Sequence, residues 1–497
     1  KKCDSVLALM TLEEKIGQMT QLEKGSALIG TVRDLALGSV LSGGGASPAS
    51  NTAKGWADMV DSFQDEALAT RLAIPIIYGV DAVHGHNNLK GATIFPHNIG
   101  LGAAGDADLV KRIGDATAVE AAATGILWDF GPCIAVARDP RWGRTYESYS
   151  EDSALVTKLG TAFIEGYQGA KTGTLTKTAA CAKHFLGDGG TVWGSSKSGD
   201  YQIDQGDTRV DEAYIRSVLL PPYESAIKSG VRTVMVSFSS MNGVKMHARK
   251  DLVTDLLKGE LGFTGFVVSD WGGMDQIDPD YHTAIVAGIN AGVDMNMVPY
   301  DGVRFIQTVM KAVENKEISM ERIDDAVRRI LRVKFEMGLF EAPKANRALA
   351  TEIRSPAHLA LAREAVAKSQ VVLKNEGALP IAKGAKKIYV AGNAADDIGL
   401  QCGGWTMTWQ GSSGAITPGT SILAAIKEKN PNAEVVYSKD ASFEGVDRNA
   451  ACVVVLGEKP YAEGVGDSEP VSLGAPASES FARARATVSR GWLVVVG

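Results

Sequence analysis

The stretch Phe266-Val267-Val268-Ser269-Asp270-Trp271 decides the fold, because an apolar run ends there in a carboxylate followed by an indole. Val267 and Val268 are β-formers that stay buried, so the run predicts a central parallel strand whose last residues emerge at the carboxyl edge of a sheet. Enzymes of the α/β classes carry their chemistry at that edge. Asp270 is therefore a candidate nucleophile or base, and Trp271 a candidate platform for a sugar ring. Alternatively, Asp270 caps a helix that begins at Gly272.

Strand-like runs alternate with amphipathic helical stretches before and after this segment. The predicted strands are Gly38–Leu41, Ile74–Val80, Leu127–Val136, Ala179–Phe185, Thr233–Phe238, Phe266–Asp270 and Val293–Val298. The predicted helices include Leu109–Ala122, Asp211–Ser229, Tyr281–Ala291 and Ile323–Phe335, and Thr11-x-x-Glu14 is a capping-box pattern. This βαβ rhythm, repeated about eight times, favours a (β/α)8 TIM-like barrel over a doubly wound open sheet.

The chain of 497 residues is too long for one compact core, which predicts two domains. Pro343 and Asn346 interrupt the helical periodicity and mark a boundary. We therefore expect a barrel catalytic domain over 1–341, a linker over 342–356 and an α/β sandwich domain over 357–497. Its predicted elements are the helix Ala357–Ser369 and the strands Lys387–Ala391, Glu434–Tyr437, Cys452–Leu456 and Trp492–Val496. The chain stops directly after a strand, so the sandwich is expected to be incomplete at its C-terminus.

Composition narrows the choice of partners. A net charge of −7 and the lack of a Lys/Arg cluster argue against nucleic acid and anionic membranes, and no apolar stretch approaches the roughly 20 residues that a membrane span needs. The five cysteines show no CxxC spacing, which argues against zinc and against a disulfide framework. The first residue is Lys1 rather than Met, which is compatible with a removed signal peptide.

Several loops place charged residues directly after predicted strands. Asp81 follows one strand, and the nearby His84-x-His86 spacing indicates either a metal pair or, as we favour, structural or sugar-contacting histidines. The segment 138–152 carries Arg138, Arg141 and Arg144 among acids and aromatics, which is typical of an ion-pair network in which one Arg faces a pocket.

Lys183 and His184 are adjacent at another strand end and cannot both face a dry core without polar partners. No phosphate-binding glycine motif accompanies them, so nucleotide binding has little support. The set that should converge at the sheet edge is Asp81, Arg144, Lys183, His184, Asp270 and Trp271. Paired charges beside an aromatic ring suit a neutral polyhydroxylated ligand, so sugar chemistry is the favoured class.

A set of strings between about residues 8 and 467 resembles glycoside hydrolase family 3, of the β-D-glucan exohydrolase and β-glucosidase type. They are GVDAVHGHNN (79–88), ATIFPHNIGLGA (92–103), RDPRWGR (138–144), ESYSED (147–152), CAKHFLGDGGT (181–191), NGVKMHA (242–248), GFVVSDW (265–271), RILRVKFEMGLFE (329–341) and CGGWTMTWQG (402–411).

The resemblance implies a (β/α)8 barrel, an (α/β)6 sandwich and retaining, exo-acting removal of glucose from β-glucans and their oligosaccharides. Asp270 would be the nucleophile. The substrate-binding residues implied by the motifs are Asp81, Arg144, Lys183, His184, Trp271 and Trp409, the last from the second domain. No metal or other cofactor is implied, and secretion or periplasmic export is expected by analogy.

The second carboxyl that retention requires is not identified by these motifs. The resemblance implies a Glu within a Gly-Ser-Glu-Gly-like string on a loop of the sandwich domain, and the sequence contains no such string. This predicts a truncated or altered chain, with Glu463 and Glu479 as substitutes that we otherwise expect at the surface. A neighbouring protomer could also supply the acid, which would make activity depend on a homo-oligomer.

Two other functions stay open. A glucan-binding protein without hydrolysis, or an impaired enzyme, is favoured by the missing acid. A family 3 β-N-acetylhexosaminidase would need a histidine in the loop after Phe185, and residues 186–200 contain none.

Overall fold

The structure, a computed structural model, describes residues 2–169, 178–377, 379–487 and 490–496. Lys1 and Gly497, the outer limits of the two predicted domains, lie outside the described residues. The chain divides into two compact units. The first comprises Lys1–Ser369 together with Glu463–Asp467, and the second comprises Gln370–Ala462 and Ser468–Gly497.

Two parallel sheets form the centre of the first unit. One has the order β11-β1-β2-β3-β4, with β1 at Thr20–Glu23, β2 at Ser39–Ser42, β3 at Ile77–Val80, β4 at Trp128–Asp129 and β11 at Asn296–Met297. The other has the order β10-β7-β5, with β5 at Cys181–Phe185, β7 at Thr233–Val236 and β10 at Phe266–Val268. Single parallel bridges, Trp128 to Ala179 and Val268 to Met295, connect the edges of the two sheets. The alternation of parallel strands and helices expected from the sequence is confirmed.

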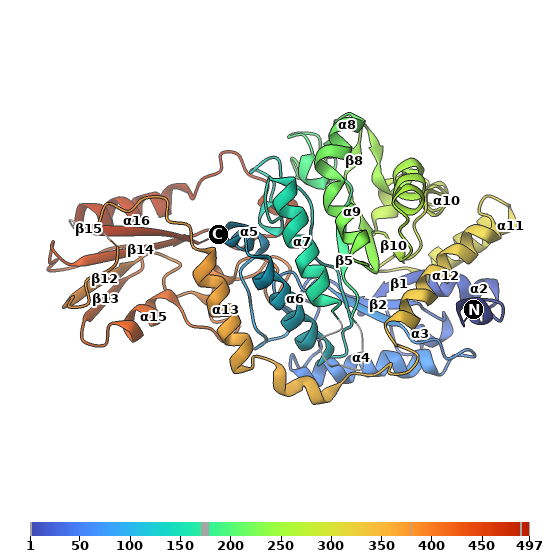
Figure 1. Cartoon of the computed structure of the whole chain (residues 1–497), viewed down its shortest axis with the longest axis horizontal. Coiled ribbons are helices and arrows are strands. Elements are labelled where there is room, and N and C mark those ends of the chain that lie inside the picture. The colour runs from blue at the N-terminus through green and yellow to red at the C-terminus, as the bar shows by residue number, and fades with distance from the viewer. Residues whose placement is uncertain (1, 170–177, 378, 488–489, 497) are drawn as a thin grey trace. The chain divides into compact units, whose positions relative to one another are not determined.

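Helices lie around these strands, as α4, α6, α7, α9 and α12 do in Figure 1. Their bounds are α1 Lys2–Leu7, α2 Leu12–Gln18, α3 Thr31–Asp34, α4 Ala53–Leu68, α5 Asn98–Ala104, α6 Ala107–Ala122, α7 Ser153–Tyr167, α8 Glu212–Tyr214, α9 Pro221–Lys228, α10 Tyr281–Ala291, α11 Gly302–Glu314, α12 Met320–Glu336 and α13 Pro356–Ser369. Two π-helical segments cover Ile215–Leu219 and Asp251–Glu260. Among the described residues, none of the helices has the length and apolarity that crossing a bilayer would take.

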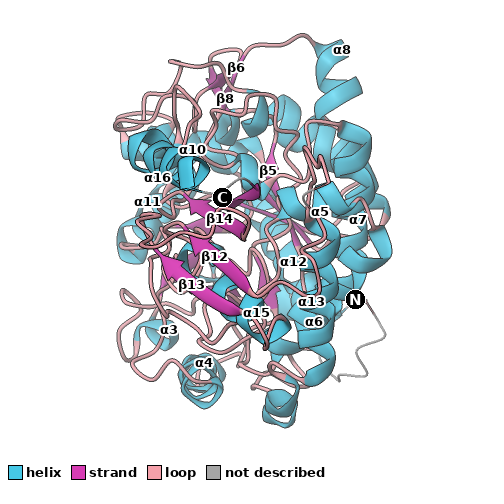
Figure 2. Ribbon diagram, turned by 90° about the vertical axis from the view of Figure 1, so that its left-hand side faces the viewer, coloured by secondary structure: helices cyan, strands magenta, loops and turns pink. Residues whose placement is uncertain are grey.

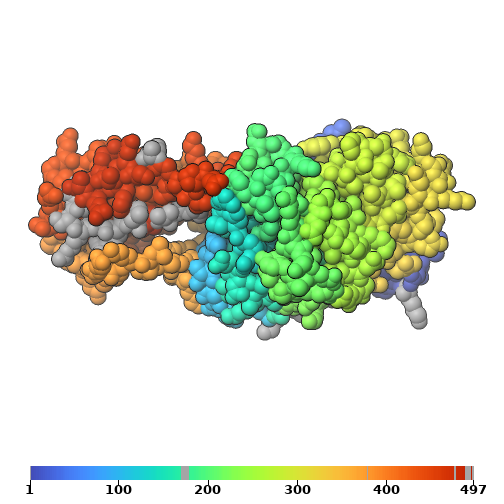
Figure 3. Space-filling model, turned by 90° about the horizontal axis from the view of Figure 1, so that it is seen from above, coloured from blue at the N-terminus to red at the C-terminus, as the bar shows by residue number. Residues whose placement is uncertain are grey.

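A small three-stranded sheet, with the order β6-β8-β9, adds to the loops that follow β5 and β7. Its strands are β6 Asp207–Thr208, β8 Ser240–Met241 and β9 Val244–Lys245. Seen from above, the green to yellow segments of the first unit form one closely packed surface (Figure 3).

Two sequence-based assignments need correction. Strand β1 was not predicted, because Thr20 and Gln21 are polar; both are buried, and Thr20 Oγ1 donates to Ile16 O while Gln21 Nε2 donates to Ser39 Oγ. The helix predicted over Asp211–Ser229 is interrupted by the π segment, which ends just before Pro221. Proline lacks an N–H and its ring clashes with the preceding turn, so the register shifts there.

Other local expectations are confirmed. Helix α10 has the predicted bounds, and α2 carries the expected capping box: Glu14 N donates to Thr11 Oγ1 at 3.2 Å, and Thr11 N donates to Glu14 Oε2 at 2.9 Å. The strand predicted over Leu127–Val136 is reduced to the two residues of β4, after which the chain leaves the sheet.

The second unit contains a parallel sheet of order β13-β12-β14-β15 (Figure 2). Its elements are β12 Lys387–Ala391, β13 Glu434–Ser438, β14 Ala451–Gly457, β15 Arg490–Val496, α14 Ile398–Cys402, α15 Ile422–Lys429 and α16 Gly474–Thr487. Alternate side chains of β12 face opposite ways: Tyr389 joins the core beneath α16, and Ile388 joins the core beneath α15. All four predicted strands of this part are present.

The boundary between the units lies later than the predicted linker over 342–356. Helix α13, expected at the start of the sandwich domain, belongs to the first unit, where Glu364 accepts two hydrogen bonds from Arg112 at 2.9 Å each. This ion pair and packing contacts hold α13 against α5 and α6, so Pro343 and Asn346 interrupt a helix without separating domains. The complete (β/α)8 barrel and (α/β)6 sandwich stay predictions.

The core beneath Asp270 depends on Phe266, which is fully buried and packs edge-on against Trp128 at 5.2 Å between ring centroids. Replacing Phe266 with Ala should lower the free energy of unfolding by about 3–5 kcal/mol, since a ring-sized cavity is left. Urea unfolding monitored by tryptophan fluorescence measures the change. Leu28→Ala, at a position that is 69% exposed, is the matched control and should change it by less than about 0.5 kcal/mol. Equal effects would show that β10 is not at the centre of the core.

Candidate active site

Asp270 lies two residues beyond β10, at the carboxyl end of the strand, as predicted. Its backbone N–H donates to His247 Nε2 at 3.1 Å, and its Oδ1 accepts from Trp271 N at 2.7 Å. Its Oδ2 accepts no hydrogen bond from the described residues and lies 3.7 Å from His184 Nε2. Burial raises the pKa of Asp270 to about 6, although Arg144 and Lys183 oppose the rise. The carboxylate is held rigidly and keeps one oxygen available.

Lys183 and Asp81 form an ion pair at the ends of β5 and β3. The distance from Lys183 Nζ to Asp81 Oδ1 is 2.8 Å, and the side chains are 3% and 15% exposed. Burial favours the neutral amine, but the Asp81 carboxylate outweighs it and holds the pKa of Lys183 above its ordinary value. The amide groups of Asn87 and Asn88 donate to Asp81 O at 3.1 and 2.9 Å and fix the loop.

His184 is the second polar residue of β5 and connects two carboxyl groups. Its Nδ1 lies 2.7 Å from Asp188 Oδ2, on the side opposite Asp270. Burial lowers the pKa of His184 well below its ordinary value, with Arg144 and Lys183 adding to the effect, and burial raises the pKa of Asp188 to about 8. The pair therefore carries no full charges at neutral pH. The expectation that Lys183 and His184 find polar partners is confirmed.

Arg144 is the one arginine of the segment 138–152 that is buried at the site. Its guanidinium donates to both carboxylate oxygens of Glu147 at 2.8 and 3.0 Å. Its Nη1 also lies 3.5 Å from Glu463 Oε1. By contrast, Arg141 pairs with Asp139 and Arg138 donates to Glu151 O nearer the surface. The predicted ion-pair network is present, and Arg144 is its buried arginine.

Glu463 belongs to the first unit and contributes to this site. It begins a 3-10 turn over Glu463–Gly466, and its side chain is only 16% exposed, so the expectation of a surface residue was wrong. Burial raises the pKa of Glu463, and the carboxylates of Asp204 and Asp270 add to the rise against the opposing effect of Arg144. Glu479, the other substitute considered, is exposed on α16 and lies 3.7 Å from Arg483. Glu463 is therefore a largely buried carboxyl beside Arg144.

Of the two predicted tryptophan platforms, only Trp271 belongs to the first unit. Its ring lies against the backbone of Gly43, where an added Cβ would approach a ring carbon to 2.4 Å, and it meets Tyr300 edge-on at 5.7 Å between centroids. Trp409 is in the second unit, where its carbonyl accepts from Trp405 N at 2.9 Å. The role of Trp409 stays a prediction.

The His84-x-His86 pair serves the structure of the loop. His84 Nδ1 lies 2.9 Å from Phe95 O, and His86 Nε2 lies 3.0 Å from Thr124 Oγ1. Both rings are buried, and burial lowers the pKa of His86 to about 4. The two rings take separate partners, so the structural interpretation holds over a metal pair.

Among the described residues, one cluster brings potential metal ligands together. Cys133, His184 and Asp188 each offer one ligand atom, and these atoms lie within 4.8 Å of one another. Burial raises the pKa of the Cys133 thiol far above its usual range. His184 and Asp188 already satisfy each other. We interpret the three as structural support for the end of β5.

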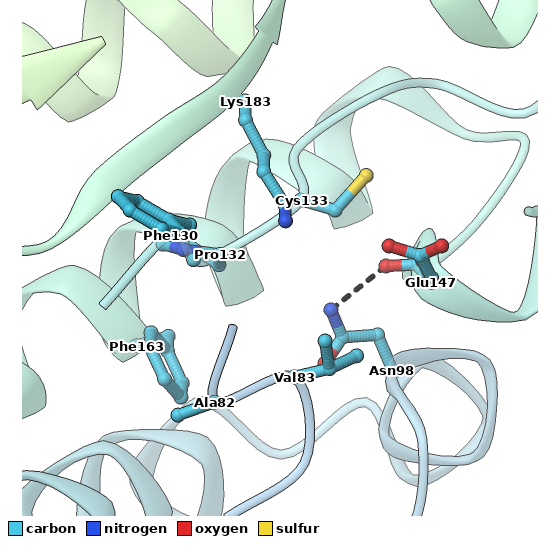
Figure 4. A pocket seen from close by; sticks show the side chains of 10 residues that line it. Ala82, Val83, Asn98, Phe130, Pro132, Cys133, Glu147, Phe163 and Lys183 are labelled. Carbon is cyan, nitrogen blue, oxygen red and sulfur yellow. Dashed lines mark hydrogen bonds between the residues drawn. The ribbon is translucent and has the colours of Figure 1, made fainter. Parts of the chain in front are cut away.

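A small cavity of about 10 Å³, close to the minimum that can hold one water, lies between Lys183 of β5 and the residues that follow β3 and β4 (Figure 4). Lys183, Cys133, Glu147 and Asn98 line it, and Asn98 Nδ2 donates to Glu147 O at 2.8 Å. The two charged side chains that line it are compensated by ion pairs, Lys183 with Asp81 and Glu147 with Arg144.

Sequence reasoning did not single out Glu147, Asp129, Asp188, Asp204 and His247 as part of this site. Asp129 is fully buried, accepts from Ala82 N at 2.9 Å, and has its pKa raised to about 8 by burial. His247 is also buried, which lowers its pKa to about 3 and keeps Nε2 an acceptor for Asp270 N. An acid inside a strand, as Asp129 is, was the available signal.

The chain resembles known proteins over most of its length. The chain is 31% identical to a lysosomal beta glucosidase of Dictyostelium discoideum over 95% of its length, and 30% identical to a periplasmic beta-glucosidase of Salmonella typhimurium over 88%. It spans 62% and 55% of the lengths of these two relatives.

Solved structures give a similar result. An exo-1,3/1,4-beta-glucanase from a Pseudoalteromonas species superposes with a TM-score of 0.91 at 40% identity, covering 99% of this chain and 63% of that one. A beta-glucosidase from Listeria innocua in complex with isofagomine gives 0.85 at 28% identity, covering 99% and 69%.

Residues 11–333 match the glycosyl hydrolase family 3 N-terminal domain, and residues 370–496 match the C-terminal domain of the same family. With both domain types matched in order over most of its length, this chain belongs to glycosyl hydrolase family 3.

Proposed function

We propose that this chain is a retaining, exo-acting β-glucosidase of the exo-β-glucanase type, with Asp270 as nucleophile and Glu463 as acid/base. One observation carries the proposal: two buried carboxyls share the surroundings of Arg144, and their pKa values are raised to different extents. Asp270, with a pKa of about 6, is mostly ionised at neutral pH, and Glu463 stays protonated. Two carboxyls kept in opposite protonation states are what general acid and nucleophile require.

In the first step, the free Oδ2 of Asp270 attacks the anomeric carbon. The bond from that carbon to the glycosidic oxygen breaks, and the proton of Glu463 moves to the departing oxygen. In the second step, the Glu463 carboxylate removes a proton from water, whose oxygen attacks the same carbon and displaces Asp270. Two inversions leave the β configuration unchanged.

The surrounding residues suit a glucose unit in the first subsite. Asp81, Lys183 and His184 present charged and neutral donors and acceptors at strand ends, and Arg144 adds a rigid donor fork. Trp271 offers an aromatic face to the next sugar, and Trp409 is proposed to cover its other face. Their place at the strand ends is consistent with the pocket of a complete (β/α)8 barrel, which we propose for the first unit. We propose an (α/β)6-type sandwich for the second unit.

We propose β-1,3- and β-1,4-linked glucose oligosaccharides as substrates, because a similar solved structure is that of an exo-1,3/1,4-beta-glucanase. A compartment outside the cytoplasm is proposed from the periplasmic and lysosomal relatives. No cofactor is needed in this scheme.

The non-hydrolytic glucan-binding alternative depended on a missing acid, and the buried Glu463 removes its main support. The β-N-acetylhexosaminidase alternative gains nothing, because the loop over 186–200 lacks the histidine it requires.

Replacing Asp270 and Glu463 separately should lower the rate of hydrolysis in two different ways. Asp270→Asn should lower kcat on cellobiose and on 2,4-dinitrophenyl β-glucoside alike by at least about 10⁴-fold, because no nucleophile remains. Glu463→Gln should lower kcat/KM for cellobiose by about 10²–10⁴-fold and leave kcat/KM for the dinitrophenyl substrate nearly unchanged, because dinitrophenolate departs without a proton. Initial rates measure both. Cellobiose hydrolysis retained by Glu463→Gln would assign the acid elsewhere, and binding of glucose without turnover in the unmodified chain would favour a binding protein.

The pH dependence should differ between the same two substrates. For cellobiose, kcat/KM should fall below about pH 6, where Asp270 takes up a proton, and should fall again above neutral pH as Glu463 loses its proton. For 2,4-dinitrophenyl β-glucoside only the acidic decline should remain. Profiles of kcat/KM between about pH 4 and 10 measure this; an alkaline decline of equal size for both substrates would contradict the role of Glu463.

A further inference from the structure

The carboxylate of Asp467 accepts four backbone hydrogen bonds from two separate loops of the first unit. Its Oδ1 accepts from Gly143 N at 2.9 Å. Its Oδ2 accepts from the N–H groups of Gln202, Ile203 and Asp204 at 3.0, 2.9 and 2.9 Å. Hydrogen bonds to an ionised acceptor are stronger than neutral ones, and successive N–H groups that converge on one oxygen form an anion-binding nest.

Asp467 closes the same short turn that begins with Glu463. Its own N–H donates to Gly464 O at 3.1 Å, so the four residues from Glu463 to Gly466 are held at one end by this carboxylate. Glu463 itself has a φ of +58°, a conformation that a non-glycine residue adopts only when its surroundings enforce it. The hydrogen bonds of Asp467 are part of that enforcement.

The fit of this turn against the two loops is close. A Cβ added at Gly143 would lie 2.0 Å from Glu463 O, and a Cβ added at Gly464 would lie 2.2 Å from a ring carbon of Tyr201. Only glycine permits the approach at either position. The turn therefore fits in one position only, and any side chain added at Gly143 would displace the backbone of Glu463.

The two loops that Asp467 binds also carry the charges around Glu463. Gly143 precedes Arg144, whose Nη1 lies 3.5 Å from Glu463 Oε1. Asp204, whose N–H binds Asp467, turns its carboxylate inward, where Trp142 Nε1 donates to Oδ1 at 2.9 Å and where it raises the pKa of Glu463. One carboxylate thus sets the positions of the acid, its cationic partner and its anionic neighbour together.

We propose that Asp467 is a positioning residue for the acid/base: it holds the Glu463 turn on the loops of Arg144 and Asp204 and does not contact substrate. The proposal rests on the role of Glu463 in the proposed function. General-acid catalysis requires the proton donor to lie within hydrogen-bond reach of the glycosidic oxygen, and a displacement of about 1 Å costs on the order of 10²-fold in rate.

The test is the leaving-group dependence of Asp467 variants of the full chain. Asp467→Ala should lower kcat on cellobiose about 10²-fold and leave kcat/KM for 2,4-dinitrophenyl β-glucoside within about threefold. Asp467→Asn should lower kcat on cellobiose less, about tenfold. Its amide oxygen can still accept from the three N–H groups of 202–204, and only the hydrogen bond from Gly143 N is lost. Asp440→Ala is the matched control: Asp440 also accepts N–H and hydroxyl hydrogen bonds, but in the second unit, and both rates should stay unchanged.

Added azide gives a readout that general loss of structure does not produce. With a displaced base, the glucosyl ester on Asp270 is hydrolysed slowly, and azide can attack the anomeric carbon without a base and displace the Asp270 carboxylate. Azide should therefore raise kcat of Asp467→Ala on the dinitrophenyl substrate and yield β-glucosyl azide, and should not affect Asp440→Ala.

Gly143→Ala displaces the turn without altering any carboxyl group and should reproduce the same pattern. This second variant tests the proposal even if Asp467→Ala does not fold. Equal loss on both substrates, in variants that keep the unmodified thermal unfolding profile, would overturn it.

Failure of this inference differs from failure of the proposed function. If Glu463→Gln abolishes cellobiose hydrolysis and Asp467→Ala and Gly143→Ala do not lower it, only the positioning role is wrong. If Glu463→Gln keeps full activity on cellobiose, the assignment of the acid is wrong and the positioning role falls with it.

Discussion

The buried guanidinium of Arg144 is the charge on which the rest of the site depends. It pairs with Glu147, which is fully buried, and also lies near Glu463. Burying carboxyl groups is costly unless a cation compensates them. Arg144 lowers the pKa of Asp270, Asp188, Asp204 and Glu463 alike, against the opposite effect of burial. Without this cation, the pKa values of these acids would be raised further by burial.

Burial and the nearby charges together leave Asp270 and Glu463 in different protonation states. This difference is the basis of the proposed chemistry. Asp270 receives a backbone N–H from Trp271 and the nearby positive charges of Arg144 and Lys183, which limit the rise of its pKa. Glu463 faces Asp204 and Asp270 as well as Arg144, so the anionic neighbours add to burial. Two chemically similar groups are thereby suited to opposite roles by their surroundings.

Much of the fold was predictable from the sequence, because local patterns agree with long-range packing. The run Phe266–Val268 is apolar, contains β-branched residues and is central in the structure. Thr20 and Gln21 are the counterexample: they are polar in sequence and buried in the sheet, where Ile16 O accepts from Thr20 and Ser39 Oγ accepts from Gln21 Nε2. The hydrophobic periodicity of the sequence does not reveal which buried polar side chains will find hydrogen-bond partners. For the same reason, the boundary after Ser369 was missed, since the helix before it packs on the first unit through Glu364 and Arg112.

The sequence by itself determined that Asp81, Lys183, His184 and Asp270 stand at strand ends, because a parallel sheet brings the carboxyl ends of its strands to one edge. Their ion pair and hydrogen bonds follow from that placement. Only the tertiary structure decided the place of Glu463. Its short polar turn follows no strand and carries no periodic signal, and it is buried because Asp467 binds the backbone of loops more than 260 residues earlier in the chain. The sequence around Glu463 does not reveal such a contact, because the N–H groups that bind Asp467 belong to loops far away in the chain.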